Sequence, residues 1–188
     1  MNNFTMIDLC SKALHKIGAN EIVSFDEGSV EAEFAKSIYP VVKNKMLSCF
    51  SWSFATKQQN LNKIFEEENE RDSDFVNAFM LPNDFLRAVK ICPKVVYKIC
   101  GNKLYTNADK VNLTYIADVD EGSFSPAFVN AFIYAMAAEF SMCLLDDATK
   151  FNLFYRLYNS ELREARFLDS VQESPKQIND FSLVDVRF

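Results

Sequence analysis

The sequence predicts a mainly α-helical protein with a small antiparallel β part: a four-helix bundle with an inserted β wing and an extended C-terminal arm. Four segments carry apolar residues at the three- and four-residue spacing of an amphipathic helix. Between the second and third of these segments, short runs of β-branched and aromatic residues alternate with turn residues. We therefore expect one domain over residues 1–172, with the β insertion at about 81–116, followed by an arm over residues 173–188.

The first two helices are predicted by their capping residues. Thr5 suits the N-cap of a helix over residues 6–17, and Gly18 suits the left-handed position just after it. Ser29 suits the N-cap of a second helix. Pro40 lies within the apolar pattern of that helix, so we expect a kink or a break there, because proline lacks the backbone N–H.

An aromatic segment and a polar segment separate the second helix from the expected sheet. Trp52 and Phe54 are large aromatic residues that we expect in the core. Residues 57–75 are mostly polar and predict a loop, and Pro82 fixes a turn before the sheet. Four runs then favour strands: 86–91, 95–99, 103–105 and 112–115.

Two further helices follow the sheet. Ser125-Pro126 is a strong helix start, and the helix to about Leu145 is apolar nearly all round, which predicts a central buried helix with Phe128 in the core. The pair Asp146-Asp147 suits the cap of a fourth helix that reaches about Val171. The apolar stripe of that helix comprises Phe151, Phe154, Leu157, Tyr158, Leu162, Ala165 and Leu168.

Composition bounds the size and the surface of the molecule. A chain of 188 residues with 49% hydrophobic residues can bury one proper core, while two compact domains would be a tight fit. Phenylalanine occurs eighteen times and tryptophan once. So much phenylalanine either fills a thick core or leaves apolar surface for a partner, and composition alone favours the core.

The net charge bears on nucleic acid as a partner. At −6, the chain has no excess of lysine and arginine to displace counterions from phosphates. We therefore expect no sequence-specific DNA binding and only weak affinity for DNA at physiological salt. An acidic protein can nevertheless surround DNA, since repulsion lets the polymer slide without sticking.

Cysteine usage and hydropathy bear on where the protein works. The five cysteines are odd in number and form no close pair, which predicts reduced, buried thiols in a protein made in a reducing cytoplasm. No uninterrupted apolar segment approaches the roughly 20 residues of a membrane span. The first residues do not have the pattern of a signal peptide, so we expect no membrane association.

The sequence offers little for catalysis. His15 is the only histidine, and it lies in a predicted helix beside two lysines, so a surface histidine is a better interpretation than a catalytic base. The four glycines have no phosphate-binding spacing, and no cluster has metal-ligand spacing. We therefore expect no enzyme, no cofactor and no metal.

Two segments are candidates for contacts outside the core. A run of acidic residues suits the lining or rim of a channel, although a solvated loop is the plainer interpretation: Glu66, Glu67, Glu68, Glu70, Asp72 and Asp74. The C-terminal segment alternates apolar and polar residues and suits an assembly arm: Phe181, Val184, Val186 and Phe188. The alternative is that this segment packs on its own subunit or makes no contact.

Several short strings occur in a characteristic order between about residues 7 and 168. They are Ala13-Leu14-His15-Lys16-Ile17-Gly18, Ile22-Val23-Ser24-Phe25-Asp26-Glu27-Gly28-Ser29, Trp52-Ser53-Phe54-Ala55, Leu81-Pro82-Asn83-Asp84-Phe85-Leu86-Arg87, Tyr115-Ile116-Ala117-Asp118-Val119, Phe124-Ser125-Pro126-Ala127-Phe128 and Glu164-Ala165-Arg166. In this order they resemble the tail tubular protein A family, the head-to-tail adaptors of short-tailed bacteriophages. The acidic run and the C-terminal segment have no counterpart in that pattern.

The resemblance implies a structural virion protein, made in the host cytoplasm, that joins the portal to the tail and encloses the channel for DNA ejection. It implies a ring of about twelve copies, with the portal protein and the tail or nozzle proteins as further partners. It implies no catalysis and no membrane, and the matched residues themselves are structural. The alternative is a small helical interaction or regulatory protein that acts as a monomer or dimer.

Overall fold

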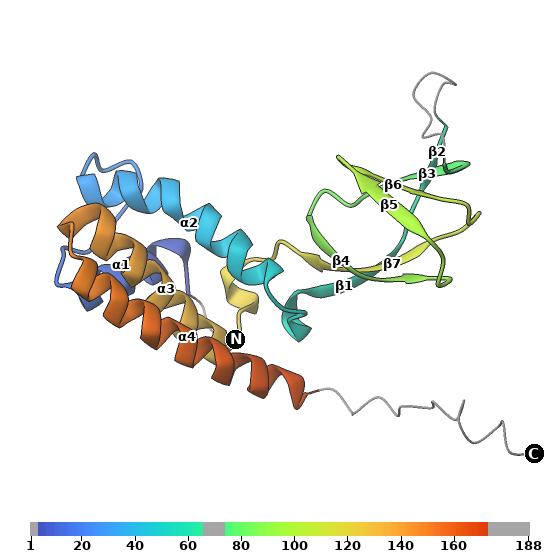
Figure 1. Ribbon diagram of the computed structural model, residues 1–188. Coiled ribbons are helices and arrows are strands. Elements are labelled where there is room, and N and C mark those ends of the chain that lie inside the picture. Colours follow the sequence, from blue (N-terminus) through green and yellow to red (C-terminus); the bar gives the residue numbers. More distant parts are fainter. Residues whose placement is uncertain (1–3, 66–73, 173–188) are drawn as a thin grey trace, which may run out of the picture.

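The computed structural model describes residues 4–65 and 74–172. Four α-helices and two antiparallel sheets form in these residues, which confirms a mainly α-helical protein with a small antiparallel β part. The helices gather at one end of the molecule and the strands at the other (Figure 1). We call these two parts the helical part and the β module.

The first two helices begin where their caps predict. Helix α1 (Met6–Ile17) has a full capping box, in which the Thr5 hydroxyl accepts from the Asp8 N–H and the Asp8 carboxylate accepts from the Thr5 N–H. It ends at Gly18, whose φ of +83° is left-handed. Helix α2 (Val30–Ser48) starts after Ser29, as predicted.

The expected break at Pro40 does not occur. Helix α2 continues through this residue for two more turns, with Pro40 on its exposed side. A proline in a helix removes one backbone hydrogen bond. The neighbouring Tyr39 and Val42 are buried, so packing of the opposite side offsets that loss.

Helix α3 (Pro126–Leu145) is the centre of the helical part, and α4 (Ala148–Ser170) lies along it (Figure 1). The Ser125 hydroxyl caps α3 by accepting from the Phe128 N–H, and the Asp147 carboxylate caps α4 by accepting from Thr149 and Lys150. Both capping predictions are confirmed. Helix α3 is buried against α1, α2 and α4, as its apolar circumference predicts.

By length and hydropathy alone, α3 could also cross a membrane, contrary to the expectation that no segment would qualify. It is the one such helix in the described ranges, and 61% of its most apolar window is buried inside the fold. A core helix that is covered on all sides has the same composition as a membrane helix. The packing of α3 therefore accounts for its hydropathy.

The β module consists of two sheets. One has the strand order β1 (Thr56–Asn60), β7 (Asn112–Ala117), β4 (Phe85–Cys92), and the other has the order β2 (Lys63–Ile64), β3 (Asn77–Met80), β6 (Lys103–Thr106), β5 (Tyr97–Cys100). Every pairing is antiparallel. Short 3₁₀ turns, η1 (Ser53–Ala55) and η2 (Glu121–Ser123), join the module to the helices on its two sides.

The β part begins at Thr56, not at about residue 81 as predicted. Strands β1, β2 and β3 lie in the segment before Leu81, most of which was predicted as a loop. Strand β1 has the sequence Thr-Lys-Gln-Gln-Asn, which carries no apolar alternation because its side chains are largely exposed. Its pairing with β7, more than fifty residues away, defines it as a strand.

The buried apolar residues form two clusters rather than a single core. The larger cluster fills the helical part and includes Trp52 and Phe128, both fully buried. The smaller lies inside the β module and includes Leu104, Leu113 and Tyr115. Each part of the molecule therefore has its own apolar interior, and the contacts between the parts decide how they are held together.

Candidate functional site

An aromatic cluster forms at the join between the helical part and the β module. Trp52 is fully buried, and its ring contacts Phe50, Phe54 and Phe128 at centroid distances of 5.0, 5.8 and 5.0 Å. Its indole N–H donates to the Met46 carbonyl at the end of α2 (2.9 Å). The cluster thus fixes the chain where it leaves α2 and enters β1.

Three of the four predicted core residues meet in this cluster. Phe128 lies edge-on to both Trp52 and Phe54, whose ring is half-buried. Pro82 is also half-buried but lies away from the cluster, at the start of β4, where its carbonyl accepts from the Phe85 N–H. The turn predicted at Pro82 is present. Pro82 itself is only partly buried, so it is not a full core residue.

A set of hydrogen bonds joins the end of α4 to the same segment. The buried Asp169 carboxylate accepts from the backbone N–H of Ser53 (2.9 Å) and from its hydroxyl (2.7 Å). These bonds link residues 116 positions apart in the chain. Hydrogen bonds to a carboxylate are stronger than neutral ones, so this contact anchors the last turn of α4 against the entry to the β module.

A third contact, a largely buried charge network, joins α2 to the segment after β7. Glu121 accepts from the Tyr39 hydroxyl (2.7 Å) and pairs with Lys43 (3.2 Å), and Lys43 also pairs with Asp118 (2.9 Å). Burial lowers the pKa of Lys43, but the hydrogen bond to Asp118 and the charge of Glu121 outweigh burial and raise it above its ordinary value.

The same network makes the one buried thiol unreactive. Burial, together with the charge of Glu121, raises the pKa of Cys10 to about 12. Burial and the same carboxylate raise the pKa of Tyr39 as well. Neither group ionises near neutral pH, so the cluster stabilises the fold and supplies no nucleophile.

Within the β module, Asp84 is the main polar anchor. Its carboxylate pairs with Lys57 on β1 (2.7 Å) and accepts from the Tyr115 hydroxyl on β7 (3.0 Å). Desolvation raises the pKa of Asp84, but the hydrogen bonds from Lys57 and Tyr115 outweigh it and hold the pKa below its ordinary value. Asp84 thus ties the start of β4 to the other two strands of its sheet.

A groove of about 650 Å³ separates the two parts of the molecule. Gln58, Lys90 and Thr114 line it from the sheet β1–β7–β4, and Phe50 and Asp169 line it from the helical part. Gln58 and Lys90 are both paired in register with Thr114, so the sheet presents a continuous polar row to the groove. The groove has polar walls and no cluster of catalytic groups.

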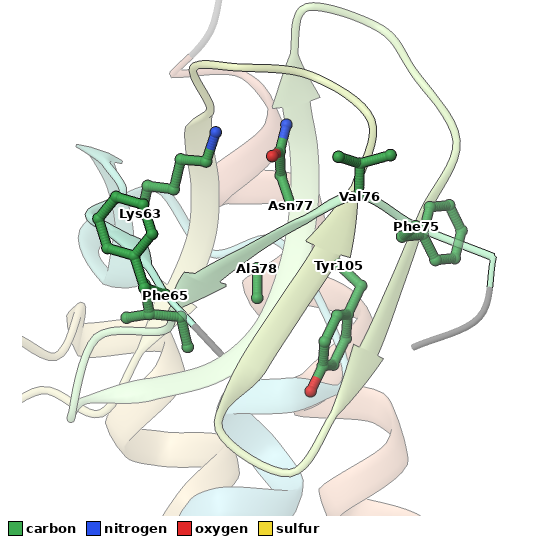
Figure 2. A pocket seen from close by; sticks show the side chains of 8 residues that line it. Lys63, Phe65, Phe75, Val76, Asn77, Ala78 and Tyr105 are labelled. Atoms are coloured by element: carbon green, nitrogen blue, oxygen red, sulfur yellow. The ribbon is translucent and has the colours of Figure 1, made fainter. Parts of the chain in front are cut away.

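A smaller hollow of about 210 Å³ lies on the second sheet. Figure 2 shows Lys63 and Phe65 on one side of it and Tyr105 and Phe75 on the other. Phe65 and Phe75 border residues 66–73, which lie outside the described part of the chain. We therefore assign no ligand to this hollow.

In the described part of the chain, α4 carries several exposed apolar residues. We call it the α4 stripe: five large apolar residues with 37–67% of their surface exposed, namely Leu153, Leu157, Phe167, Leu168 and Val171. The buried side of the helix is formed instead by Phe154, Tyr158, Leu162 and Ala165. Helix α4 therefore has two apolar sides, one packed on α3 and one in solvent.

The prediction that Leu157 and Leu168 share one apolar stripe with the buried residues of α4 is wrong, because both are exposed. Their positions fit a broad apolar pattern in which the two sides of α4 cannot be separated by spacing alone. Leu153, Phe167 and Val171 were not singled out as functional. An apolar residue among charged neighbours on the far side of the helix was the available signal.

The remaining candidates fall partly outside the structure. Glu66, Glu67, Glu68, Glu70 and Asp72 and the arm residues Phe181, Val184, Val186 and Phe188 lie outside the described residues, and Asp74 is exposed at their border. The prediction of buried cysteines holds for Cys10 only. Four cysteines are exposed: Cys49, Cys92, Cys100 and Cys143.

His15 is exposed on α1 and lies 3.5 Å from Glu21, which fits a surface histidine. Within residues 4–65 and 74–172, no group of three or more His, Cys, Asp or Glu side chains could hold a metal ion. A scan against protein-family models gives no match, and no curated protein is similar enough to count as a relative.

Proposed function

We propose that this chain is a structural virion protein, the subunit of a head-to-tail adaptor ring that joins the portal to the tail and encloses the DNA channel. In this proposal the four helices act as a bundle, the β module is its wing, and residues 173–188 are its arm. The observation that carries the proposal is the α4 stripe, an apolar surface at both ends of one helix that no other described residue covers. The resemblance in sequence specifies the kind of assembly.

The size of the α4 stripe supports a role in assembly. Its five exposed side chains give on the order of 400–500 Å² of exposed surface, within the range of the largest apolar patch on a typical monomer, and such a patch is often functional. Exposure of such a surface to water is unfavourable. Each Å² of apolar surface removed from water contributes roughly 25 cal/mol. A partner that covers the stripe would recover that free energy.

The strings that resemble the adaptor family support the assignment, because they meet in space. Trp52 and Phe128, from two of the strings, are in ring contact. Asp84 and Tyr115, from two others, are hydrogen-bonded, and Arg87 donates to Ser51 at the join (3.1 Å). A set of residues that together hold the helical part and the β module is what a shared two-part fold would retain.

The test is assembly on a portal protein of the matching phage, followed by native mass spectrometry. The wild-type chain is expected to join the portal as a closed ring of identical subunits. Leu157→Asp places a charge within the α4 stripe and is expected to prevent the ring, while thermal unfolding shows that the subunit still folds. Val96→Asp is the matched control, because Val96 is 78% exposed but lies in the β module.

A small interaction protein is the alternative, and the same experiment separates the two. That protein would remain a monomer or a discrete dimer whether or not a portal is present. A wild-type chain that never associates with the portal would contradict the adaptor proposal.

A further inference from the structure

We propose that the α4 stripe of one copy packs against the outer face of α2 in the next copy. This inference rests on the proposed function, since it names the two surfaces that would close the ring. Subunits related by rotation meet through two different faces, and each copy must carry both. The α4 stripe is the first face, and α2 presents the second.

Helix α2 has an apolar outer face of its own. Val30 and Val41 are 59% and 66% exposed, and Phe34 between them is half-buried. At 100° per residue these three positions fall within about 40° of one another, so they form one narrow stripe. We call it the α2 face. Its side chains point away from the buried row of Ala35, Tyr39 and Met46.

The α2 face and the α4 stripe lie on different sides of the molecule. Helices α2 and α4 flank α3, and their outer faces are turned away from one another (Figure 1). Both helices begin at the end remote from the β module and end beside it (Figure 1). Copies placed side by side in the same direction can therefore bring α4 of one against α2 of the next, repeatedly.

Pairing of the α4 stripe with itself is disfavoured by charge. Helical spacing places Arg156 and Arg163 on one flank of the stripe, with Glu164 near its middle. In an antiparallel pair related by a two-fold axis, each flank lies against the same flank of the partner, so arginine meets arginine. In a parallel pair, Glu164 meets the Glu164 of the other copy. A different surface avoids both repulsions.

The first two residues of the α2 face match the first two of the α4 stripe in spacing, and the two helices are similar in length. Val30 and Phe34 are four residues apart, as are Leu153 and Leu157, so the two pairs can interdigitate when the helices run in the same direction. The helices have 19 and 23 residues. At 1.5 Å per residue both span roughly 30 Å, enough for a contact along the whole helical part.

The charges beside the two stripes are complementary in this arrangement. When Val30 is set level with Leu153, Glu31 comes within one turn of Arg156. Lys45 then lies about one turn from Glu164. Opposite charges at this spacing favour the pairing, and they favour the parallel direction that the ring requires.

The experiment is a complementation test with two variants. Val41→Asp damages the α2 face and leaves the α4 stripe intact, while Leu157→Asp does the reverse. Both residues are exposed, and circular dichroism checks that each variant folds. Each variant alone, at several hundred micromolar in the ultracentrifuge, is expected to be a monomer. Their equimolar mixture has one intact contact and is expected to stop at a dimer of twice the 21.6 kDa chain mass.

The wild type is expected to associate beyond the dimer under the same conditions, and Val96→Asp is expected to behave as the wild type. A Val41→Asp variant that dimerises alone would show that α4 pairs with α4, which overturns the inference. The inference is also overturned if the mixture of the two variants stays monomeric, or if the wild type stays monomeric. If both variants still form rings on a portal, the adaptor function stands and these two faces are wrong.

Discussion

Trp52 has two roles in the fold. It fills the end of the helical core with an aromatic ring, and it donates to the Met46 carbonyl. We expect Trp52→Ala to lower the free energy of unfolding by about 3–5 kcal/mol, the usual cost of emptying a buried aromatic site. Urea denaturation measures this change. Phe54→Ala should lower the free energy of unfolding by less than this, because the Phe54 ring is half-exposed.

Trp52→Phe is the control for the ring itself. It retains most of the apolar volume but removes the indole donor from the Met46 carbonyl, which keeps only the weaker thiol donor of Cys49, so its free energy of unfolding is expected to lie between those of wild type and Trp52→Ala. An unchanged denaturation midpoint in both Trp52→Ala and Phe54→Ala would contradict the burial of this cluster.

Asp84 should make the stability of the β module depend on pH in the acid range. Its pKa in the folded protein is lowered, through Lys57 and Tyr115. A lowered folded pKa means that its stabilisation is present above the unfolded value of about 4 and is lost as the pH falls through the folded value. Asp84→Asn should therefore destabilise the protein at pH 7, with a smaller difference from wild type at pH 3.

Urea denaturation at both pH values tests this prediction, with Asp109→Asn as the control. Asp109 is exposed, and its nearest cation, Lys63, lies 3.6 Å away. The prediction is contradicted if the difference in unfolding free energy between Asp84→Asn and wild type grows as the pH falls.

At the scale of elements, the helices could be predicted because their signals are local. Thr5, Ser29, Ser125 and Asp147 each cap a helix within three residues of themselves. Strand β1 could not be predicted, because its polar sequence becomes a strand only through β7. The α4 stripe was missed for a related reason: an apolar residue indicates a buried side without specifying what covers it.

The hydrogen bonds between α4 and η1 could not be predicted from the sequence either, because Asp169 and Ser53 are 116 positions apart. We expect Asp169→Asn to lower the free energy of unfolding by about 1–3 kcal/mol, since it weakens bonds to a buried carboxylate. Ser53→Ala removes the hydroxyl but keeps the backbone N–H. A double-mutant cycle should give a coupling energy between the two changes. Strict additivity would show that these hydrogen bonds do not stabilise the fold.

At the scale of the whole molecule, the charge is distributed unevenly. The net charge is −6, yet residues 85–108 contain five basic residues and no acidic residue: Arg87, Lys90, Lys94, Lys98 and Lys103. The chain as a whole has no excess of lysine and arginine, and this part of the β module is an exception. Lys90 and Lys94 are exposed, whereas Arg87 is half-buried and donates to Ser51.

We expect this exception not to provide strong DNA binding. Each phosphate contact contributes about 0.9 to the slope of the logarithm of affinity against the logarithm of salt concentration. Three exposed lysines in this region, Lys90, Lys94 and Lys98, therefore predict a slope near −3 and an affinity that is weak at low salt and lost at about 150 mM salt. Fluorescence anisotropy with a labelled duplex measures both quantities on the isolated subunit.

The variant Lys90→Gln with Lys94→Gln should remove most of the binding seen at low salt. Lys110→Gln, in the turn before β7, is the control, because it removes one lysine charge outside residues 85–108, against the two that the double variant removes within them. Sub-micromolar binding of the wild type at physiological salt would contradict weak affinity. A double variant that binds as well as the wild type would show that other residues contact the phosphates. Weak, salt-sensitive contact is what a channel that must release DNA requires, because tight binding would slow passage.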